Sequence, residues 1–384
     1  MAHPLPLPFA EYPPNAAPYL KRASRVRAFE RRDLASAASM FLEVFRAGTG
    51  IDQAAVERDL EAVFFENPAS PEVSASLVCE RPDGGLAGFL GVFPTRFGFE
   101  GRPVDGASIG VWMIGGKQRS TGAAAALLGH LFRKKLDLLV TDTSNERSFA
   151  SDGVRTMHLL ASHSLRWLKP LRMPALAAEK LTQRLHPAIA RALSRNLAAL
   201  ESRIIPVSRG KFIEAAAFRR CGAEAFTARY LELSAHWPVR PLWSAGELAW
   251  RLGIAGRRPS LGPLAFGEAL DGRGAPVGVY AFHLSPPNKA AVLQILSQPR
   301  FEGATVAAVV ADADARGLSS VGGQCDPRLM AGLYQLPGVR YRHTCSTLAL
   351  APEPRLAQAA LVGDALIGGL VGDNWTPLSS EPYR

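Results

Sequence analysis

The sequence is poor in the features that mark secreted, membrane-embedded or metal-binding proteins. It has only four cysteines, Cys79, Cys221, Cys325 and Cys345, which lie far apart and form no C-x-x-C pair. We therefore expect reduced thiols in a cytoplasmic protein, with neither a disulfide framework nor a metal site. No uncharged apolar run approaches the roughly 18 residues that a membrane-spanning helix needs. Residues 1–24 lack the basic and apolar regions of a signal peptide, and their prolines predict an extended tail.

Charged residues are also scarce, at 20% of the chain, while hydrophobic residues make up 47%. This balance is typical of a globular protein with a full core, and a length of 384 residues favours two domains. Most of the net charge of +10 lies in residues 165–222, which hold twelve Arg or Lys and three acidic residues. Such a segment favours anionic partners, although blocks of like charge are more often solvated surface. It lacks a pattern of interleaved aromatics and a known nucleic-acid module, so nucleic acid is not an expected partner.

The most informative stretch is Ala107–Asn145. It reads as an apolar strand, a glycine-rich basic turn, a helix beginning near Ala123, and a second apolar strand over 136–140. A strand that leads through a tight turn into a helix makes an anion site, because the first N–H groups of a helix lack internal partners and carry partial positive charge. Gly122 lets the backbone of this turn approach a ligand closely.

This turn resembles a known signature. Arg119, Ser120, Thr121, Gly122, Ala123 and Ala124 match the R/Q-x-x-G-x-G/A motif of the GCN5-related N-acetyltransferase (GNAT) superfamily. The resemblance implies that these six residues hold the pyrophosphate of acetyl-coenzyme A. It also implies that a backbone N–H near Trp112, Met113 and Ile114 holds the thioester carbonyl, and that Asn145 holds the pantetheine arm.

The residues that would move protons are less clear from the sequence. Asp142 and Glu146 flank the expected cleft, and a partly buried carboxylate there could act as a general base, although both could equally be ordinary polar loop residues. GNAT enzymes often have a tyrosine about seven residues after the Asn, which protonates the leaving thiolate. Asp152 occupies that position here, so the general acid is unassigned.

A competing motif lies inside the same stretch. Gly106-Ala107-Ser108-Ile109-Gly110 is a literal G-x-S-x-G, the nucleophile elbow of serine hydrolases. That elbow requires a sharp turn at the serine followed directly by a helix. An apolar strand follows Ser108 instead, so a hydrolase using Ser108 is a remote alternative.

The element pattern and the resemblance predict an α/β protein of two GNAT-like domains, each a mixed, mostly antiparallel sheet flanked by helices, as in bacterial tandem-GNAT proteins. We expect a tail over 1–24, a GNAT domain with the acyl-coenzyme A site over 25–164, a basic helical insert or linker over 165–222, a second GNAT-like domain over 223–350, and a C-terminal tail over 351–384. The second half carries Ser297–Gly303 in place of the motif. Within it, Arg229–Leu233 predicts a strand.

The sequence therefore favours an N-acyltransferase that moves an acetyl group from acetyl-coenzyme A to an amine of a small-molecule acceptor. A non-catalytic tandem-GNAT protein that binds a ligand or partner is the main alternative. Homo-oligomerisation, acyl chain length and the identity of the acceptor are left open.

Overall fold

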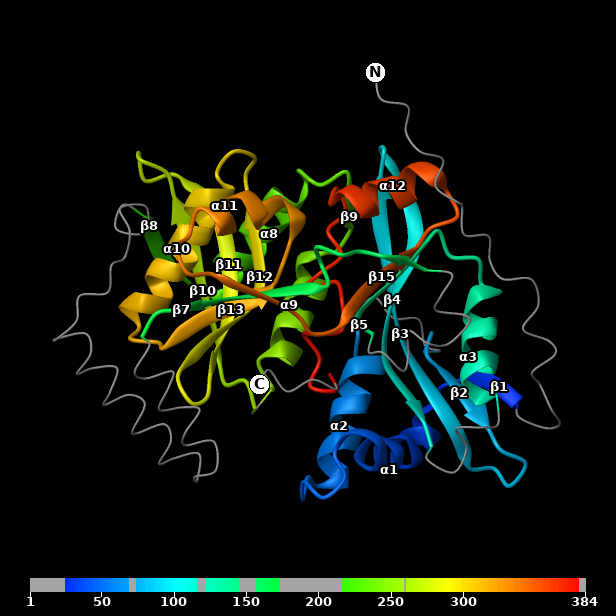
Figure 1. Cartoon of the computed structure of the whole chain (residues 1–384). Coiled ribbons are helices and arrows are strands. Elements are labelled where there is room, and N and C mark those ends of the chain that lie inside the picture. Colours follow the sequence, from blue (N-terminus) through cyan, green and yellow to red (C-terminus); the bar gives the residue numbers. More distant parts are fainter. Residues whose placement is uncertain are drawn as a thin grey trace. The chain divides into compact units, whose positions relative to one another are not determined.

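The computed structural model describes residues 25–68, 74–115, 122–144, 157–172, 216–258 and 260–379. These residues form two compact units that interleave along the chain. Unit 1 contains the residues up to Leu160, Pro238–Leu242 and Cys345–Ala365, and unit 2 contains Ala161–Trp237, Trp243–Thr344 and the residues from Leu366 onward. Figure 1 shows the chain in sequence colours.

Unit 1 is built on one sheet with the strand order β1-β2-β3-β4-β5-β15-β6, and β9 pairs with β3. The strands are β1 (Arg25–Ala28), β2 (Leu77–Glu80), β3 (Leu86–Phe99), β4 (Arg102–Ile114), β5 (Leu138–Ser144), β6 (His158–Leu159), β9 (Val239–Pro241) and β15 (Ser346–Leu350). β4 and β5 run parallel, and the other named pairs are antiparallel. Gly84 and Gly101 lie in the two hairpins with φ of 82° and 79°, a conformation that glycine adopts without strain.

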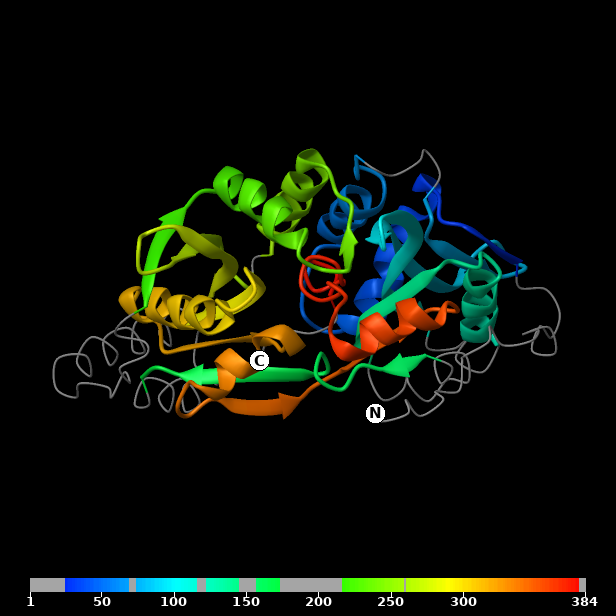
Figure 2. The ribbon, with the colours of Figure 1, turned by 90° about the horizontal axis from the view of Figure 1, so that it is seen from above.

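The helices of unit 1 cover both faces of this sheet. They are α1 (Leu34–Phe45), preceded by the 3₁₀ turn η2 (Arg31–Asp33), then α2 (Gln53–Phe64), α3 (Ala123–Phe132) and α12 (Pro354–Val362). α1 and α2 lie on one face and α3 on the other (Figure 2). Alternate side chains of β3 explain this arrangement, because Phe89 and Phe93 pack on Phe64 of α2, whereas Leu90 shares a core cluster with Leu127 of α3.

Unit 2 has a second sheet, with the order β14-β7-β13-β12-β11-β10-β8. The strands are β7 (Leu165–Pro170), β8 (Ala217–Cys221), β10 (Leu264–Leu270), β11 (Pro276–Ser285), β12 (Lys289–Ser297), β13 (Ser320–Gln324) and β14 (Arg340–His343). The helices are α8 (Ala223–Ser234), α9 (Ala245–Ala255), α10 (Glu302–Ala315) and α11 (Met330–Tyr334), and the 3₁₀ turn η6 (Pro327–Leu329) precedes α11. α8 and α9 lie on one face and α10 on the other (Figure 2). Phe226 of α8 meets Phe266 of β10, while Val306 and Val310 of α10 join the core cluster of the opposite face.

The two sheets exchange one strand. β7 follows β6 along the chain but lies between β13 and β14 in unit 2. Conversely, β15 follows β14 but lies between β5 and β6 in unit 1. Each sheet is therefore completed by a strand from the other half of the sequence.

This exchange corrects the predicted domain boundaries. The predicted insert over 165–222 contributes β7 and β8 to the sheet of unit 2, and its basic middle lies outside the described residues. β15, predicted to belong to the second domain, completes the sheet of unit 1. The predicted tail over 351–384 contains α12 in unit 1 and a buried segment in unit 2, whereas residues 1–24 lie outside the described ranges.

Two local predictions are also wrong. The predicted helical insert begins at Leu165, but Leu165–Pro170 forms strand β7. Pairing with β13 on one side and β14 on the other outweighs the helical pattern of the segment that it begins. Arg229–Leu233 was expected to be a strand but lies in α8. Phe226, Tyr230 and Leu233 are buried at helical spacing, and five residues are too few to show that period.

The predicted fold class is confirmed: the chain is α/β, with two mixed, mostly antiparallel sheets flanked by helices. Each described sheet contains one parallel strand pair, β4–β5 in unit 1 and β12–β13 in unit 2. None of the helices in the described ranges has both the length and the apolar character needed to cross a bilayer.

Candidate functional site

β4 and β5 part from each other in the middle of the sheet of unit 1. They pair in parallel at three positions, Gly106–Leu138, Ala107–Leu139 and Ser108–Val140. Beyond the last pair, β4 continues to Ile114 and β5 continues to Ser144 without pairing to each other. Strands that separate in this way expose backbone N–H and C=O groups toward the gap, where a ligand can bind them.

A β-bulge lies in β4 within this unpaired part. Gly110 pairs with Gly91 and Trp112 pairs with Leu90, so Val111 is an extra residue on β4. Val111 has φ of 53°, which is a strained conformation for a β-branched residue. A bulge redirects the neighbouring backbone groups and leaves the extra residue out of the ladder. The strain is stored beside the point where β4 leaves β5.

The three β4 residues predicted to face the donor follow this bulge directly. Met113 is fully buried, and Trp112 and Ile114 are half-buried and pack on the core cluster that includes α3. The Nε1–H of Trp112 is buried and has no hydrogen-bond partner among the described residues. A buried donor without a partner is costly, so this group is available to an incoming acceptor atom.

The helix that follows β4 starts at the predicted glycine. Gly122 has φ of 77° and its carbonyl accepts the Ala126 N–H at 2.9 Å, so it is the N-cap of α3. The N–H groups of Ala123 and Ala124 at the first turn have no partner inside the helix. A helix N-terminus is a place where an anion can bind, and the anion predicted for this turn stays a prediction. Arg119, Ser120 and Thr121 lie outside the described residues.

Of the two predicted bases, Asp142 lies within the described residues and Glu146 does not. Asp142 is 0% exposed within β5, and the Cys345 thiol donates to its backbone carbonyl at 3.4 Å. It shares a sheet face with Val140, opposite Leu139, which packs in the cluster that contains α3. The sequence placed Asp142 at a polar strand end and gave no sign that β15 would pair beside this strand. Glu146 and Asn145, together with Asp152, lie outside the described residues.

The serine-hydrolase alternative is wrong. Ser108 is fully buried in the middle of β4, where it pairs with Phe93 on one side and Val140 on the other. A nucleophile elbow needs an exposed serine on a turn. The described residues also contain no group of His, Cys, Asp and Glu side chains that could hold a metal ion.

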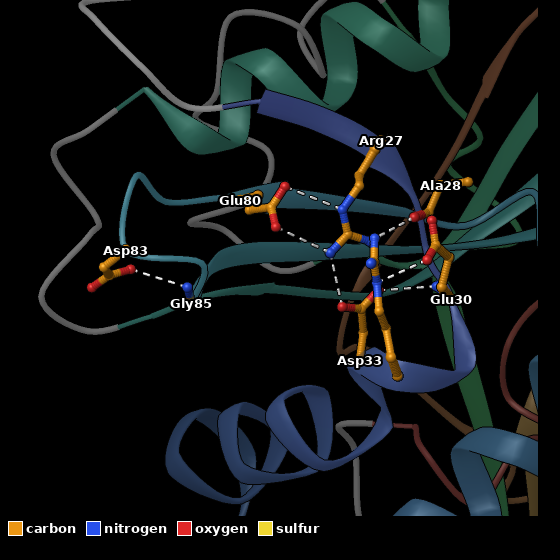
Figure 3. Close-up of polar contacts among 8 residues, drawn as sticks. Arg27, Ala28, Glu30, Asp33, Glu80, Asp83 and Gly85 are labelled. Carbon is orange, nitrogen blue, oxygen red and sulfur yellow. Dashed lines mark hydrogen bonds and ion pairs between the residues drawn. The ribbon is translucent and has the colours of Figure 1, made fainter.

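A charged network fixes α1 over this end of β4. Arg27 of β1 forms two hydrogen bonds to the Asp33 carboxylate, at 2.7 and 2.9 Å, and a third to Glu80 of β2 at 3.2 Å (Figure 3). Asp33 in turn accepts the Glu30 N–H at 3.0 Å and leads directly into α1. α1 packs on β3 and β4, with Met40 near Gly115 just beyond β4.

This network changes the acidity of both partners. Burial alone would raise the pKa of Asp33, but the hydrogen bonds from Arg27 and the Glu30 N–H, with the charges of Arg27 and Arg32, outweigh it and lower that pKa. The hydrogen bond to Asp33 raises the pKa of Arg27. Both groups are therefore charged at neutral pH, and α1 is held by an ion pair that is largely shielded from solvent.

Comparisons with known proteins identify the fold. No protein-family model matches the sequence, and no curated protein matches it. Solved structures do match. A conserved protein of unknown function from Enterococcus faecalis V583, described as a probable N-acyltransferase, is 12% identical with a TM-score of 0.52, covering 85% of this chain and 72% of its own. The chain has the GNAT fold.

Two further neighbours support the same assignment. A GCN5-related N-acetyltransferase from Kribbella flavida is 15% identical with a TM-score of 0.50, covering 85% of this chain and 70% of its own. Another, from Anabaena variabilis ATCC 29413, is 12% identical with a TM-score of 0.52, covering 86% and 73%. Because the matches span both units, the GNAT fold extends over the doubled architecture predicted from the sequence.

Sequence reasoning missed two parts of this candidate site. The bulge at Val111 has no signal in an apolar strand, because valine is an unusual residue at positive φ. The sequence signal next to the bulge is the pair of glycines Gly91 of β3 and Gly110 of β4. A side chain on Gly91 would begin 2.5 Å from the Gly110 carbonyl. The role of β15 beside β5 could not be predicted either, because more than 200 residues separate Asp142 from Ser346.

Proposed function

We propose that unit 1 binds acyl-coenzyme A, with acetyl-coenzyme A as the first donor to test, and transfers the acyl group to an amine of a small-molecule acceptor. The observation that carries this proposal is the parting of β4 from β5 beside the strained bulge at Val111. The N-terminus of α3 at Gly122 follows on the same chain segment. A separated strand pair and a helix N-terminus that begins at a glycine suit a donor with an amide-rich arm and a pyrophosphate.

The reaction follows from the roles assigned to these residues. The acceptor nitrogen attacks the thioester carbonyl carbon, the C–N bond forms, and the C–S bond breaks as the thiolate leaves. A backbone N–H of Trp112, Met113 or Ile114 stabilises the negative charge on the carbonyl oxygen. Arg119, Ser120, Thr121, Gly122, Ala123 and Ala124 bind the pyrophosphate, and Asn145 binds the amide-rich arm.

The reaction also requires two proton transfers. The nitrogen must lose a proton to a base, and the departing thiolate must gain one. Asp142 and Glu146 are the proposed bases. The complete burial of Asp142 favours Glu146, since a base must reach the acceptor nitrogen directly or through one water.

The alternative is a tandem-GNAT protein that binds a ligand without catalysis. Two observations favour it: Asp142 is buried, and no tyrosine occupies position 152. Detection of free coenzyme A thiol during incubation with acetyl-coenzyme A and a panel of amines separates the two. Binding without thiol release for any amine supports the alternative.

Donor binding is tested by isothermal titration calorimetry with acetyl-coenzyme A. We expect Gly122→Trp to weaken binding by at least about a hundredfold, or about 2.7 kcal/mol, because a large side chain would fill the turn. Gly101→Trp is the matched control: Gly101 has φ of 79°, close to that of Gly122, but has open space around it in the β3–β4 hairpin.

A charge variant completes the test. Arg119→Ala should weaken binding about tenfold or more through loss of a phosphate contact, whereas Arg96→Ala, at an exposed ion pair with Asp105, should not. If the wild-type protein produces no heat with acetyl-coenzyme A, donor binding is disproved.

A further inference from the structure

Unit 2 repeats the strand geometry of the proposed donor site. β12 and β13 pair in parallel from Lys289–Ser320 to Val292–Gly323; beyond this pair β12 continues to Ser297 without pairing to β13, which ends at Gln324. β12 also has a bulge: Gln294 pairs with Ala281 and Val292 with Phe282, so Leu293 is the extra residue. α10 follows β12 as α3 follows β4. The sheet of unit 2 therefore contains a second pair of diverging strands.

The end of the chain occupies this second divergence. The backbone of residues 366–371 runs against both strands: the Leu370 N–H donates to Gln294 Oε1 of β12 at 3.1 Å, and Gly368 lies against Gln324 of β13. A side chain on Gly369 would begin 2.5 Å from the Leu293 carbonyl, at the bulge itself. Glycine at 368 and 369 lets the backbone approach this closely.

Buried contacts hold the segment there. We call residues 366–378 the C-terminal plug. Six of its apolar side chains are at most 1% exposed: Leu366, Ile367, Leu370, Val371, Trp375 and Leu378. The Trp375 ring meets that of Trp250 edge-on at 5.2 Å, and the Arg251 guanidinium lies 4.7 Å from its centroid. Burial on this scale gives the plug the character of core.

Three arginines also bind polar groups of the plug. Arg251 donates to the Leu370 carbonyl at 3.3 Å, Arg258 donates to the Asn374 carbonyl, and Arg166 donates to Asn374 Oδ1 at 3.3 Å. Arg251 is completely buried, and burial lowers its pKa to about 10. Removing the plug would leave buried donors without partners, which opposes its release.

Little room remains beside the plug. A cavity of about 30 Å³ lies among Leu293, Gln294, Gln324, Leu366 and Gly369, large enough for about two water molecules. An acyl thioester with its pantetheine arm is many times larger. The space beside the plug is therefore much smaller than a donor molecule.

The connection from β12 into the N-terminus of α10 also differs from the corresponding connection from β4 into α3 in unit 1. In unit 1 the eight residues 115–122 connect β4 to α3, whereas in unit 2 the four residues 298–301 connect β12 to α10. Glu302 is an acidic residue in the first turn of α10, where it would repel a phosphate. Gly332 of α11 also packs against Gly303 in the first turn of α10. The contact is so close that a side chain at position 332 would begin 2.8 Å from the Gly303 Cα.

We infer that the C-terminal plug is a permanent internal occupant of the second diverging strand pair, so that unit 2 takes no acyl-coenzyme A and each chain binds one donor molecule. The part of this inference that concerns donor number rests on the proposed function of unit 1. The occupancy of unit 2 by the plug is independent of it.

Hydrogen exchange of the full-length protein tests the plug directly. We expect peptides within residues 366–378 to exchange at least about a thousandfold more slowly than unstructured chain, as for core segments, and to be unchanged by saturating acetyl-coenzyme A. Peptides covering Ile109–Ile114 and Gly122–Leu128 should gain protection from the same ligand. Fast exchange of 366–378, or an increase in its exchange when the donor is added, overturns the inference.

Donor number is counted by native mass spectrometry with acetyl-coenzyme A. We expect one molecule per wild-type chain and none for Gly122→Trp. Two molecules per chain, or one retained by Gly122→Trp, would place a donor in unit 2 and overturn the inference. No binding to the wild-type chain, together with slow exchange of 366–378, supports the plug and disproves the proposed donor function of unit 1.

Discussion

The two diverging strand pairs of this chain differ in what fills them. In unit 1, β4 and β5 part beside the bulge at Val111, and a glycine N-cap with φ of 77° begins the next helix. In unit 2, β12 and β13 part beside the bulge at Leu293, but residues 366–371 lie against both strands. The same backbone device is therefore a candidate ligand site in one unit and part of the hydrophobic core in the other.

A fold alone therefore does not define a binding site. Both units have the sheet order, the parallel pair and the bulge of the site. What distinguishes them is local: the length of the turn before the helix, the acidic Glu302, and the glycines at 368 and 369. Function therefore has to be argued from the side chains at each strand pair.

Removing the exchanged strand β15 should have the largest effect on folding. A chain that ends at Thr344 lacks β15, so β5 and β6 of unit 1 lose their common partner and the core loses Leu348 and Leu350. It also lacks the plug of unit 2. We expect no cooperative thermal transition by circular dichroism, because both units lose core at once.

A chain that ends at Ser379 is the control for this truncation, since it retains every described residue. It should melt within about 2 °C of the full-length protein, because it loses no described core residue. A sharp, native-like transition in the chain ending at Thr344 would show that the units fold without the exchange.

A single substitution in the plug should have a smaller effect, confined to unit 2. Trp375→Ala removes a completely buried ring and should cost about 3–5 kcal/mol of unfolding free energy in urea titrations. The dissociation constant for acetyl-coenzyme A should stay within about twofold, because Trp375 lies in unit 2. Tyr334→Ala, at a side chain that is 70% exposed, should cost less than about 0.5 kcal/mol. A tenfold change in donor affinity for Trp375→Ala would show that the plug and the donor site are coupled.

The sequence predicted the local elements of the candidate site in unit 1 better than it predicted the contacts between distant segments. In unit 1, the order strand, glycine turn, helix, strand is local, and Gly122 begins the helix where the motif places it. The strand exchange is not local: nothing in Leu165–Pro170 or Ser346–Leu350 records which sheet each joins. The plug shows the same limit. The sequence predicted only a tail there, because its partners Gln294 and Arg251 are more than 70 residues away along the chain.

The smallest effect concerns the ion pair that holds α1 on β4 of the open unit. Asp33→Asn removes the carboxylate that Arg27 binds, and should cost about 1–3 kcal/mol at pH 7. The folded protein lowers the pKa of Asp33, so its stabilising contribution is fully present above the unfolded value of about 3.9 and is lost as pH falls through the lower folded value. The stability difference between wild type and Asp33→Asn in urea titrations should therefore be constant from pH 7 to about 5 and shrink below about pH 4.

Asp105→Asn, at an exposed ion pair, should show neither the cost nor the pH dependence. A difference that persists unchanged to pH 3 would mean that Asp33 acts through its shape and neutral hydrogen bonds, and that the charge of the pair does not hold α1 over the site.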